Sequence, residues 1–233
     1  MKVAIHQPHY LPWLGYLAKW AAADLFIFLD GVQYEKNGWQ NRNRIKTRDG
    51  ARWLTVPVHA RLGLRICDVA IDDSRAWRAR HLRAIEQAYA RAACLERYRP
   101  ALRDFYAREW TRLAPLACDS AEWLARRVGI TTPVRLASDL GVTSTDPTGR
   151  LVALCRAAGA DTYLAGSAGP GYMDLAQFAA AGIGVRGQRY EHPVYPQVHG
   201  EFVPHLSALD LLLTAGDQAL PIIRKGDAWS KLL

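Results

Sequence analysis

The 233-residue sequence has little that would place it in a membrane, a disulfide-rich or a zinc-ribbon class. Its apolar stretch 11–29 is interrupted by Lys19 and Asp24 and falls short of a membrane-spanning helix. Its start does not resemble a signal peptide, so we expect a cytoplasmic protein without a membrane partner. Its four cysteines form no C-x-x-C pair, which argues against a zinc ribbon or a dithiol redox motif, and we interpret all four as buried, inert thiols.

Recognised metal and cofactor motifs are also missing. Five of the seven histidines, at positions 6, 9, 192, 199 and 205, are candidate metal ligands, but they form no H-E-x-x-H or compact triad, so we predict no metal site. The turn Gly166–Gly171 precedes a predicted helix, where an anion would find backbone N–H groups. It matches neither a Walker loop nor G-x-G-x-x-G, and we predict no bound cofactor.

Acidic residues are too few to balance the basic ones. Thirty Lys and Arg against 22 Asp and Glu give a net charge of +8. A basic surface favours phosphorylated small molecules, an acidic protein or nucleic acid. Between residues 75 and 135, however, acids are interleaved with the arginines as on a solvated helix face, so nucleic acid is the minor alternative.

Strand and helix patterns alternate along much of the chain, which indicates an α/β fold. The run 24–30 is apolar throughout, as in a strand buried on both faces of a parallel sheet. Pro147 behind Asp146 marks a helix start. We predict strands at 2–6, 24–30, 53–58, 66–71, 133–138, 161–166 and 183–190, and helices at 14–23, 147–158, 172–181 and 206–215.

Two segments depart from this alternation. Residues 31–50 are polar and without period, which predicts a long functional loop. Residues 74–130 keep helical spacing and predict three helices inserted in the α/β frame, with Pro100 and Pro115 as breaks between them. The whole chain, 1–233, is thus predicted to be one Rossmann-like domain: a mostly parallel sheet, helices on both faces and an α-helical insertion.

The polar, glycine-rich and aromatic segments follow the predicted strands. Ligands of open α/β sheets bind at the carboxyl ends of the strands, so we expect these segments to converge on one edge. They span 6–13, 30–44, 138–139, 166–171 and 192–197.

The segment His6–Trp13 is the most unusual of the five. Pro8 and Pro12 restrict its backbone, so its side chains would be preorganised. His6 is a candidate general base, because imidazole titrates near neutral pH. The alternative is a strand-end histidine that is hydrogen-bonded to a neighbouring turn.

Arg42 and Arg44 are candidates for holding a phosphate or a carboxylate. If they lie on a strand, their alternation places both on one face, with Asn41 and Asn43 opposite. The alternative is an ordinary solvated basic loop.

Eight sequence blocks begin at His6, Asp30, Trp39, Trp53, Tyr163, Tyr172, His192 and Leu206. Together they resemble the WbqC-like protein family, and the match covers nearly the whole chain. The resemblance implies a bacterial biosynthetic setting, such as O-antigen or capsule sugar loci and natural-product clusters, but it supplies no reaction. This chain has His9 where the family usually has Asn, so we favour His6 over His9 as the functional histidine.

A Rossmann-like resemblance to nucleotidyltransferases is weaker, since the H-x-G-H motif of that group is missing. We therefore expect an acyl- or aminoacyl-transferring enzyme that modifies an amine of an amino sugar or of a carrier-bound intermediate. The alternatives are a thioester or amide hydrolase at the same site, and a non-catalytic module that binds a carrier protein or a nucleotide sugar. The expected partners are a small, phosphorylated substrate and an acidic acyl- or peptidyl-carrier protein.

In this scheme His6 is the base, and the phosphate is held by Arg42 and Arg44. Gln7, Gln33 and Asn43 would orient the substrate or stabilise an oxyanion. The acceptor pocket would be walled by Tyr10, Trp13 and Trp39. The further candidates are Asp30 and His192 for catalysis, and Tyr34, Gly166, Tyr172, Tyr195 and Gln197 for substrate contact.

Overall fold

The computed structural model describes residues 1–167, 169–171 and 173–233. Its central sheet has the strand order β10-β9-β8-β1-β2-β7. The strands β9, β8, β1, β2 and β7 are parallel, and β10 runs antiparallel to β9 at the edge. The bounds are β1 Lys2–His6, β2 Leu25–Phe28, β7 Val134–Leu136, β8 Thr162–Ala165, β9 Gly184–Tyr190 and β10 Asp227–Lys231.

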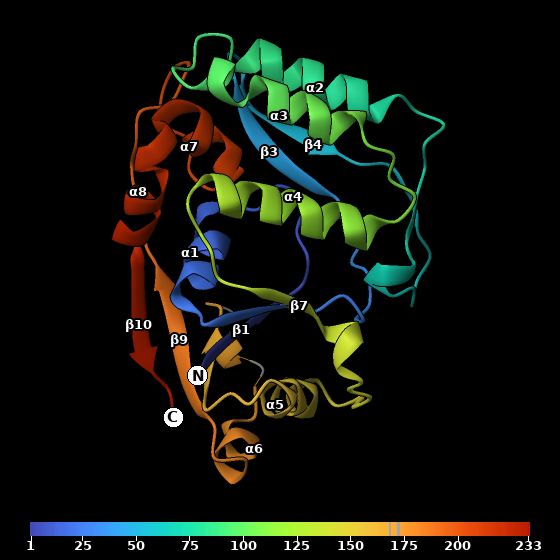
Figure 1. Cartoon of the computed structure of the whole chain (residues 1–233), viewed down its shortest axis with the longest axis vertical. Helices are drawn as coiled ribbons and strands as arrows, with labels where there is room; N and C mark the ends of the chain where they lie inside the picture. The colour runs from blue at the N-terminus through green and yellow to red at the C-terminus, as the bar shows by residue number, and fades with distance from the viewer. Residues whose placement is uncertain (168, 172) are drawn as a thin grey trace.

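Helices cover both faces of this sheet, as the sequence predicts. Along β1, Val3 and Ile5 point into one apolar cluster, while Ala4 between them points into the other. The helices α5 (Pro147–Ala157) and α6 (Leu175–Ala180) lie on the Val3 side. The helices α1 (Leu14–Ala22), α4 (Leu113–Arg127), α7 (Ala208–Ala215) and α8 (Ala219–Lys225) lie on the other side (Figure 1). The predicted α/β, Rossmann-like class is therefore confirmed.

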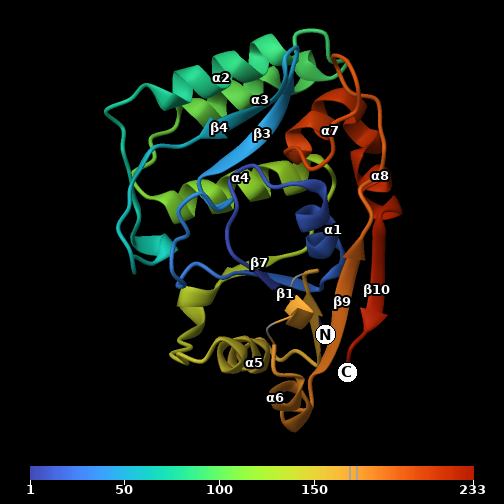
Figure 2. The same ribbon diagram turned by 180° about the vertical axis from the view of Figure 1, so that it is seen from behind.

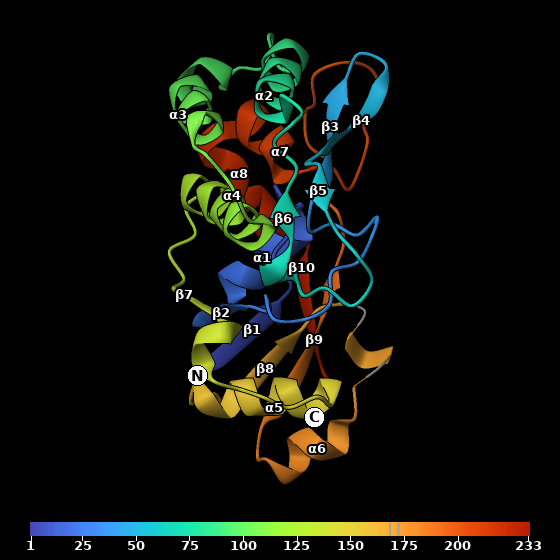
Figure 3. The same cartoon turned by 90° about the vertical axis from the view of Figure 1, so that its right-hand side faces the viewer.

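A β-hairpin and two helices form a further layer beyond α1 and α4 (Figure 2). The hairpin consists of β3 (Arg42–Thr47) and β4 (Gly50–Thr55), and the helices are α2 (Trp77–Ala88) and α3 (Leu95–Ala107). α2 and α7 lie between the hairpin and α3 (Figure 3). The prediction of one long loop at 31–50 is therefore wrong for its second half.

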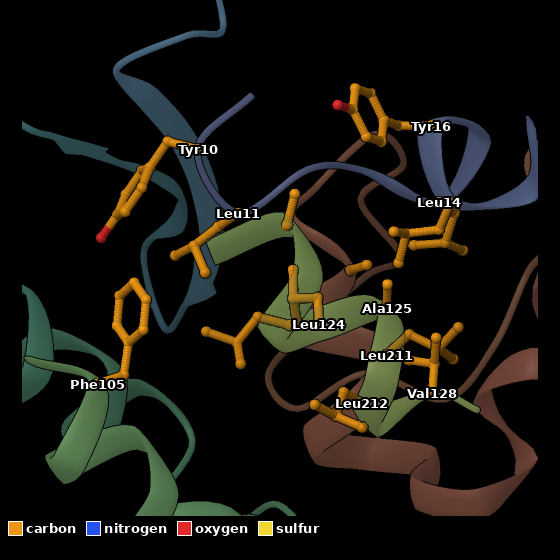
Figure 4. Close-up of a cluster of buried hydrophobic side chains, with 14 of the residues drawn as sticks. Tyr10, Leu11, Leu14, Tyr16, Phe105, Leu124, Ala125, Val128, Leu211 and Leu212 are labelled. Atoms are coloured by element: carbon orange, nitrogen blue, oxygen red, sulfur yellow. The ribbon is translucent and has the colours of Figure 1, made fainter. Parts of the chain in front are cut away.

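The three helices predicted in 74–130 are present as α2, α3 and α4. Their inner faces join the same apolar cluster as α1 and α7, and Figure 4 shows Leu11, Leu14, Leu124 and Leu212 among the side chains of this cluster. The proline breaks are wrong, because Pro100 lies within α3 and Pro115 in the first turn of α4. The N–H groups of the first helical turn have no partner within the helix, so Pro115 costs no helical hydrogen bond, whereas Pro100, the sixth residue of α3, costs one.

Other boundaries also differ from the prediction. The segment 66–71 is a 3₁₀ turn followed by the two-residue strand β6 (Ala70–Ile71), which pairs with β5 (Val58–His59). β4 ends before Pro57, and β7 passes into a 3₁₀ turn at Ala137–Leu140. No helix in the described part of the chain is both long and apolar enough to cross a membrane.

Candidate functional site

The carboxyl ends of the parallel strands lie along one edge of the sheet, and side chains link them there. Asp30, after β2, accepts hydrogen bonds from the backbone N–H (3.1 Å) and hydroxyl (2.7 Å) of Ser138, after β7. Lys19 of α1 lies against Gly166, after β8: a Cβ built on Gly166 would be 3.6 Å from the Lys19 Nζ. The expected convergence is therefore present at these strand ends.

His6 is the last residue of β1 and is partly exposed. Its Nδ1 lies 3.1 Å from the backbone oxygen of Gln7. Because a carbonyl oxygen only accepts, the proton is on Nδ1 and the lone pair is on Nε2. Within the residues that the structure describes, nothing bonds to Nε2. Burial lowers the pKa of His6 well below its ordinary value, and a positive charge on the nearby Lys19 lowers it further.

His9 and Tyr16 pack around the His6 ring. The ring centroids of His6 lie 4.7 Å from His9 and 4.5 Å from Tyr16. Burial lowers the pKa of His9 to about 3. The Tyr16 hydroxyl donates to the Gln7 backbone oxygen at 3.1 Å. His9 therefore supports the His6 ring as a neutral, buried neighbour.

Lys19 is a member of this cluster that the sequence analysis missed. It is 2% exposed, and its Nζ donates to the backbone oxygen of Ile5 at 3.0 Å. Burial lowers its pKa to about 7, and it forms no ion pair in the described part of the chain. The signal was available: Lys19 is the only charged residue of the helix Leu14–Ala22.

Gln7 is held by the segment that leads into β3. Gln40 Nε2 donates to Gln7 Oε1 at 2.7 Å, and the backbone N–H of Tyr10 donates to the Trp39 oxygen at 3.1 Å. The amide N–H groups of Gln7 have no acceptor among residues 1–167, 169–171 and 173–233. Gln7 thus presents free donors beside His6.

Two predicted contact residues lie in the core instead. Tyr10 is fully buried, and its hydroxyl lies 2.6 Å from the Tyr106 hydroxyl and 3.0 Å from His81 Nδ1. Asn43 Nδ2 donates to the backbone oxygen of Leu11 at 2.7 Å. These bonds fix the turn after β1 to the insertion and to the hairpin.

His192 belongs to a separate aromatic group around Trp13. The two rings are stacked at 6.4 Å, and Trp13 also contacts Tyr190 at 5.4 Å. His192 Nδ1 lies 3.0 Å from the Pro193 oxygen, and burial lowers the pKa of His192. No contact in the described residues joins His192 to His6.

Tyr195 and Gln197 brace the segment behind this aromatic group. Tyr195 is buried, and Gln197 exchanges two hydrogen bonds of 2.9 Å with the backbone of Val203. Asp30 likewise uses both carboxylate oxygens on Ser138. The predicted contact residue Tyr172 lies outside the described residues, as does Ala168 of the Gly166–Gly171 turn.

Arg42 and Arg44 lie on one face of β3, as their alternation predicts. Their guanidinium carbons lie 4.3 Å and 5.6 Å from the ring centre of Trp53. Arg42 borders an open cleft of about 970 Å³ that Gln33 and Tyr34 also line. The arginines are thus on the hairpin, next to but separate from the His6 cluster.

The thiols of the four cysteines form no hydrogen bond with His6, Gln7 or Lys19 among the described residues. Cys118 and Cys155 are buried, whereas Cys67 and Cys94 are partly exposed, so the prediction of four buried thiols is wrong for two of them. Burial raises the pKa of Cys155 to about 12 and that of Cys118 well above its ordinary value. No group of three or more His, Cys, Asp or Glu side chains in the described residues could hold a metal ion.

The sheet topology and this edge define a Rossmann-like α/β protein with its candidate site at the carboxyl ends of the strands. The chain belongs to the WbqC-like protein family, whose model matches residues 7–222. It is 37% identical over 228 residues to the uncharacterized protein Rv1507c of Mycobacterium tuberculosis, covering 96% of this chain and 97% of that protein. No solved structure matches the chain.

Proposed function

We propose that this protein transfers an acyl or aminoacyl group from a thioester to an amine, with His6 as the general base. The observation that carries the proposal is the state of the His6 ring. The 3.1 Å contact between Nδ1 and the Gln7 backbone oxygen assigns the proton to Nδ1, and no hydrogen bond in the described residues reaches Nε2. A base must be unprotonated and reachable to act.

The electrostatics of the cluster support an unprotonated base at neutral pH. Burial is the largest cause that lowers the pKa of His6, and a positive charge on Lys19 lowers it further. A low pKa weakens the imidazole as a base, but the amine nitrogen becomes strongly acidic once it bonds to the acyl carbon. This acidity of the nitrogen offsets the weak basicity of the imidazole.

The proposed reaction balances without a cofactor. The amine nitrogen attacks the thioester carbon, so that a C–N bond forms and the C–S bond breaks. The proton lost by the nitrogen passes to His6 Nε2 and from there to the departing thiolate, which leaves as a thiol. His6 returns to its starting state.

Gln7 is our candidate for stabilising the oxyanion of the tetrahedral intermediate. Its Oε1 is occupied by Gln40, which leaves the N–H donors of its amide for the substrate oxygen. Asn43, with its donors used on the turn, is not included. Gln33 is exposed on the cleft, where it would contact the donor rather than the reacting carbon.

The net charge of +8 supports an acidic donor, either a phosphorylated thioester or an acyl- or peptidyl-carrier protein. Amino sugars of O-antigen or capsule pathways and amines of natural-product pathways are the proposed acceptors. Such thioester chemistry would take place in the cytoplasm.

The test is to incubate the protein with acyl thioesters and amines and to identify the products by mass spectrometry. We expect an amide, and a loss of about 100-fold or more in its rate of formation for His6→Ala. His59→Ala, which removes an exposed histidine of β5, is the matched control and should retain full activity. Free acid without amide would mean hydrolysis, and unchanged turnover in His6→Ala would refute the role of His6.

A further inference from the structure

An exposed aromatic and basic surface lies on the hairpin, outside the His6 cluster. We call it the Trp53 platform; it consists of Trp39, Arg42, Arg44 and Trp53. The two indole rings lie 5.5 Å apart and are 39% and 42% exposed. Exposed tryptophan pairs of this kind are costly to hydrate and are typical of binding surfaces.

The platform differs from the other stacks of arginine on tryptophan. Arg108 lies 4.3 Å from the ring centre of Trp110, as close as Arg42 is to Trp53. Trp110, however, is buried, and Arg108 forms an ion pair of 2.7 Å with Asp119. Among the described residues, Trp53 is the one exposed indole with an arginine stacked on it.

The positive charges of the platform are not neutralised. Arg42 donates to the side-chain and backbone oxygens of Asn37, and Arg44 donates to the backbone oxygen of His205 at 3.4 Å. Within the residues that the structure describes, neither Arg42 nor Arg44 forms an ion pair with a carboxylate. Neutral oxygens therefore orient both guanidinium groups and leave their charges available to an anion.

The adjoining cleft extends this positive surface. Arg42 lines it together with Lys36 and Arg61, which form no ion pair in the part of the chain that the structure covers. Its acidic lining is Glu35 and Asp72, and Asp72 accepts two hydrogen bonds from Ser74 and lies 4.0 Å from Arg75. The cleft thus has room and net positive charge for phosphate groups.

We propose that the Trp53 platform and this cleft bind the nucleotide part of the acyl donor, a purine nucleotide with several phosphates such as that of a coenzyme A thioester. The purine stacks on the exposed indole surface, and the phosphates lie against Arg42 and the cations of the cleft. This inference rests on the proposed function, since it names the donor class for that reaction.

The platform is bonded to the His6 turn, which fits this role. The Trp39 backbone oxygen accepts from the N–H of Tyr10 at 3.1 Å, and the neighbouring Gln40 bonds to Gln7 at 2.7 Å. A nucleotide held on the platform therefore lies beside the wall of the catalytic edge. The flexible arm of the thioester would carry the acyl carbon from there to His6.

The test is isothermal titration calorimetry with coenzyme A, ADP, adenosine and inorganic phosphate as separate ligands. We expect coenzyme A and ADP to bind, and adenosine and phosphate alone to bind more weakly. Arg42→Ala and Trp53→Ala should each weaken coenzyme A binding by about 10-fold or more. Trp39→Ala tests the second indole, and Arg108→Ala is the matched control that should bind as wild type.

Three outcomes would overturn the inference. These are no binding of coenzyme A or ADP, binding that Arg42→Ala and Trp53→Ala leave unchanged, and tighter, strongly salt-dependent binding of a single-stranded oligonucleotide. Circular dichroism confirms that each variant is folded.

Unacylated coenzyme A cannot transfer a group, so the result is independent of turnover. If it binds while no thioester yields an amide, the nucleotide site stands and the proposed reaction falls. If carrier-bound thioesters yield an amide while coenzyme A and ADP do not bind, the proposed reaction stands and the nucleotide site is refuted.

Discussion

At the residue scale, the buried amine of Lys19 is central to the electrostatics of the His6 cluster. It lies in an apolar helix, bonds one backbone oxygen and has no ion pair among the residues described. Its charge is one of the causes that lower the pKa of both His6 and His9. A buried, weakly compensated lysine costs folding free energy, so its presence at this edge favours a functional role.

We predict that Lys19 makes stability rise with pH above neutrality. Its pKa is about 7 in the folded chain and 10.5 in the unfolded chain, so between these values the unfolded state binds the extra proton. The free energy of unfolding of the wild type, relative to that of Lys19→Met, should therefore increase by roughly 1.4 kcal/mol per pH unit from about pH 7.5 to 9.5. Urea denaturation at several pH values measures it.

Lys225→Met, at an exposed lysine of α8, is the control for this measurement. It should track the wild type across the whole range. Equal pH slopes for wild type and Lys19→Met would show that Lys19 is charged in the folded protein and would contradict the assignment.

His9 gives a second prediction, on the acidic side. Its pKa is lowered from 6.5 to about 3, so the unfolded state binds more protons between these values and stability falls as the pH drops below 6.5. His9→Asn removes this group. The stability difference between variant and wild type should shift in favour of the variant by roughly 1.4 kcal/mol per unit from pH 6 to 4.5. A difference that stays constant with pH would refute it.

At the scale of elements, the start of α1 is fixed by contact with Trp13. A Cβ on Gly15 would lie 2.3 Å from the Trp13 ring, which is closer than any real contact. The ring also stacks with His192. The second residue of α1 is therefore glycine because the indole occupies the space of a side chain, not because the backbone needs glycine.

We predict that Gly15→Ala destabilises the protein, although alanine is the better helix former. The helix preference favours alanine by about 0.5–1 kcal/mol, whereas displacing a packed side chain costs about 1–3 kcal/mol. Urea denaturation should show a net loss, and near-ultraviolet circular dichroism should show a changed tryptophan environment. Gly31→Ala, where a Cβ would meet nothing within 4 Å, is the control. A Gly15→Ala variant that is more stable than the wild type would show that the Trp13 ring does not occupy this space.

The hairpin β3–β4 shows why part of the fold could not be predicted from the sequence. Its core-facing side includes Asn43, whose amide bonds the turn after β1, so a buried position carries a polar residue. Its outer side carries Arg42 and Arg44 over an exposed tryptophan. Neither face follows the apolar alternation of a strand, because long-range hydrogen bonds and stacking replace apolar burial.

At the scale of the whole molecule, the sequence was enough to predict the α/β frame and the shared edge. The apolar run of β2 and the glycine and proline signals of the later helices are local features of the sequence, so they can be recognised without knowledge of the tertiary contacts. It was not enough to predict which polar residues face that edge. Tyr10 and Asn43 lie in the same segments as His6 and Arg42, and only the tertiary packing turns them inward.

We predict that the chain unfolds as one unit. The insertion helices α2, α3 and α4 share one apolar cluster with α1 and α7, and Tyr10 bonds Tyr106 across it. Urea unfolding followed by far-ultraviolet circular dichroism and by tryptophan fluorescence should give coincident, single transitions. Separate transitions for the two probes would show that the insertion is an independent unit.

The most direct test of His6 as the general base is an NMR titration of its ring in protein labelled with ¹³C and ¹⁵N at histidine, with its signals assigned by their loss in His6→Ala. We predict a neutral ring at pH 6.5, with the proton on Nδ1 and an unprotonated Nε2, and a pKa below 6.5. A ring that is charged at pH 6.5, or that carries its proton on Nε2, would contradict the role of His6 as the base.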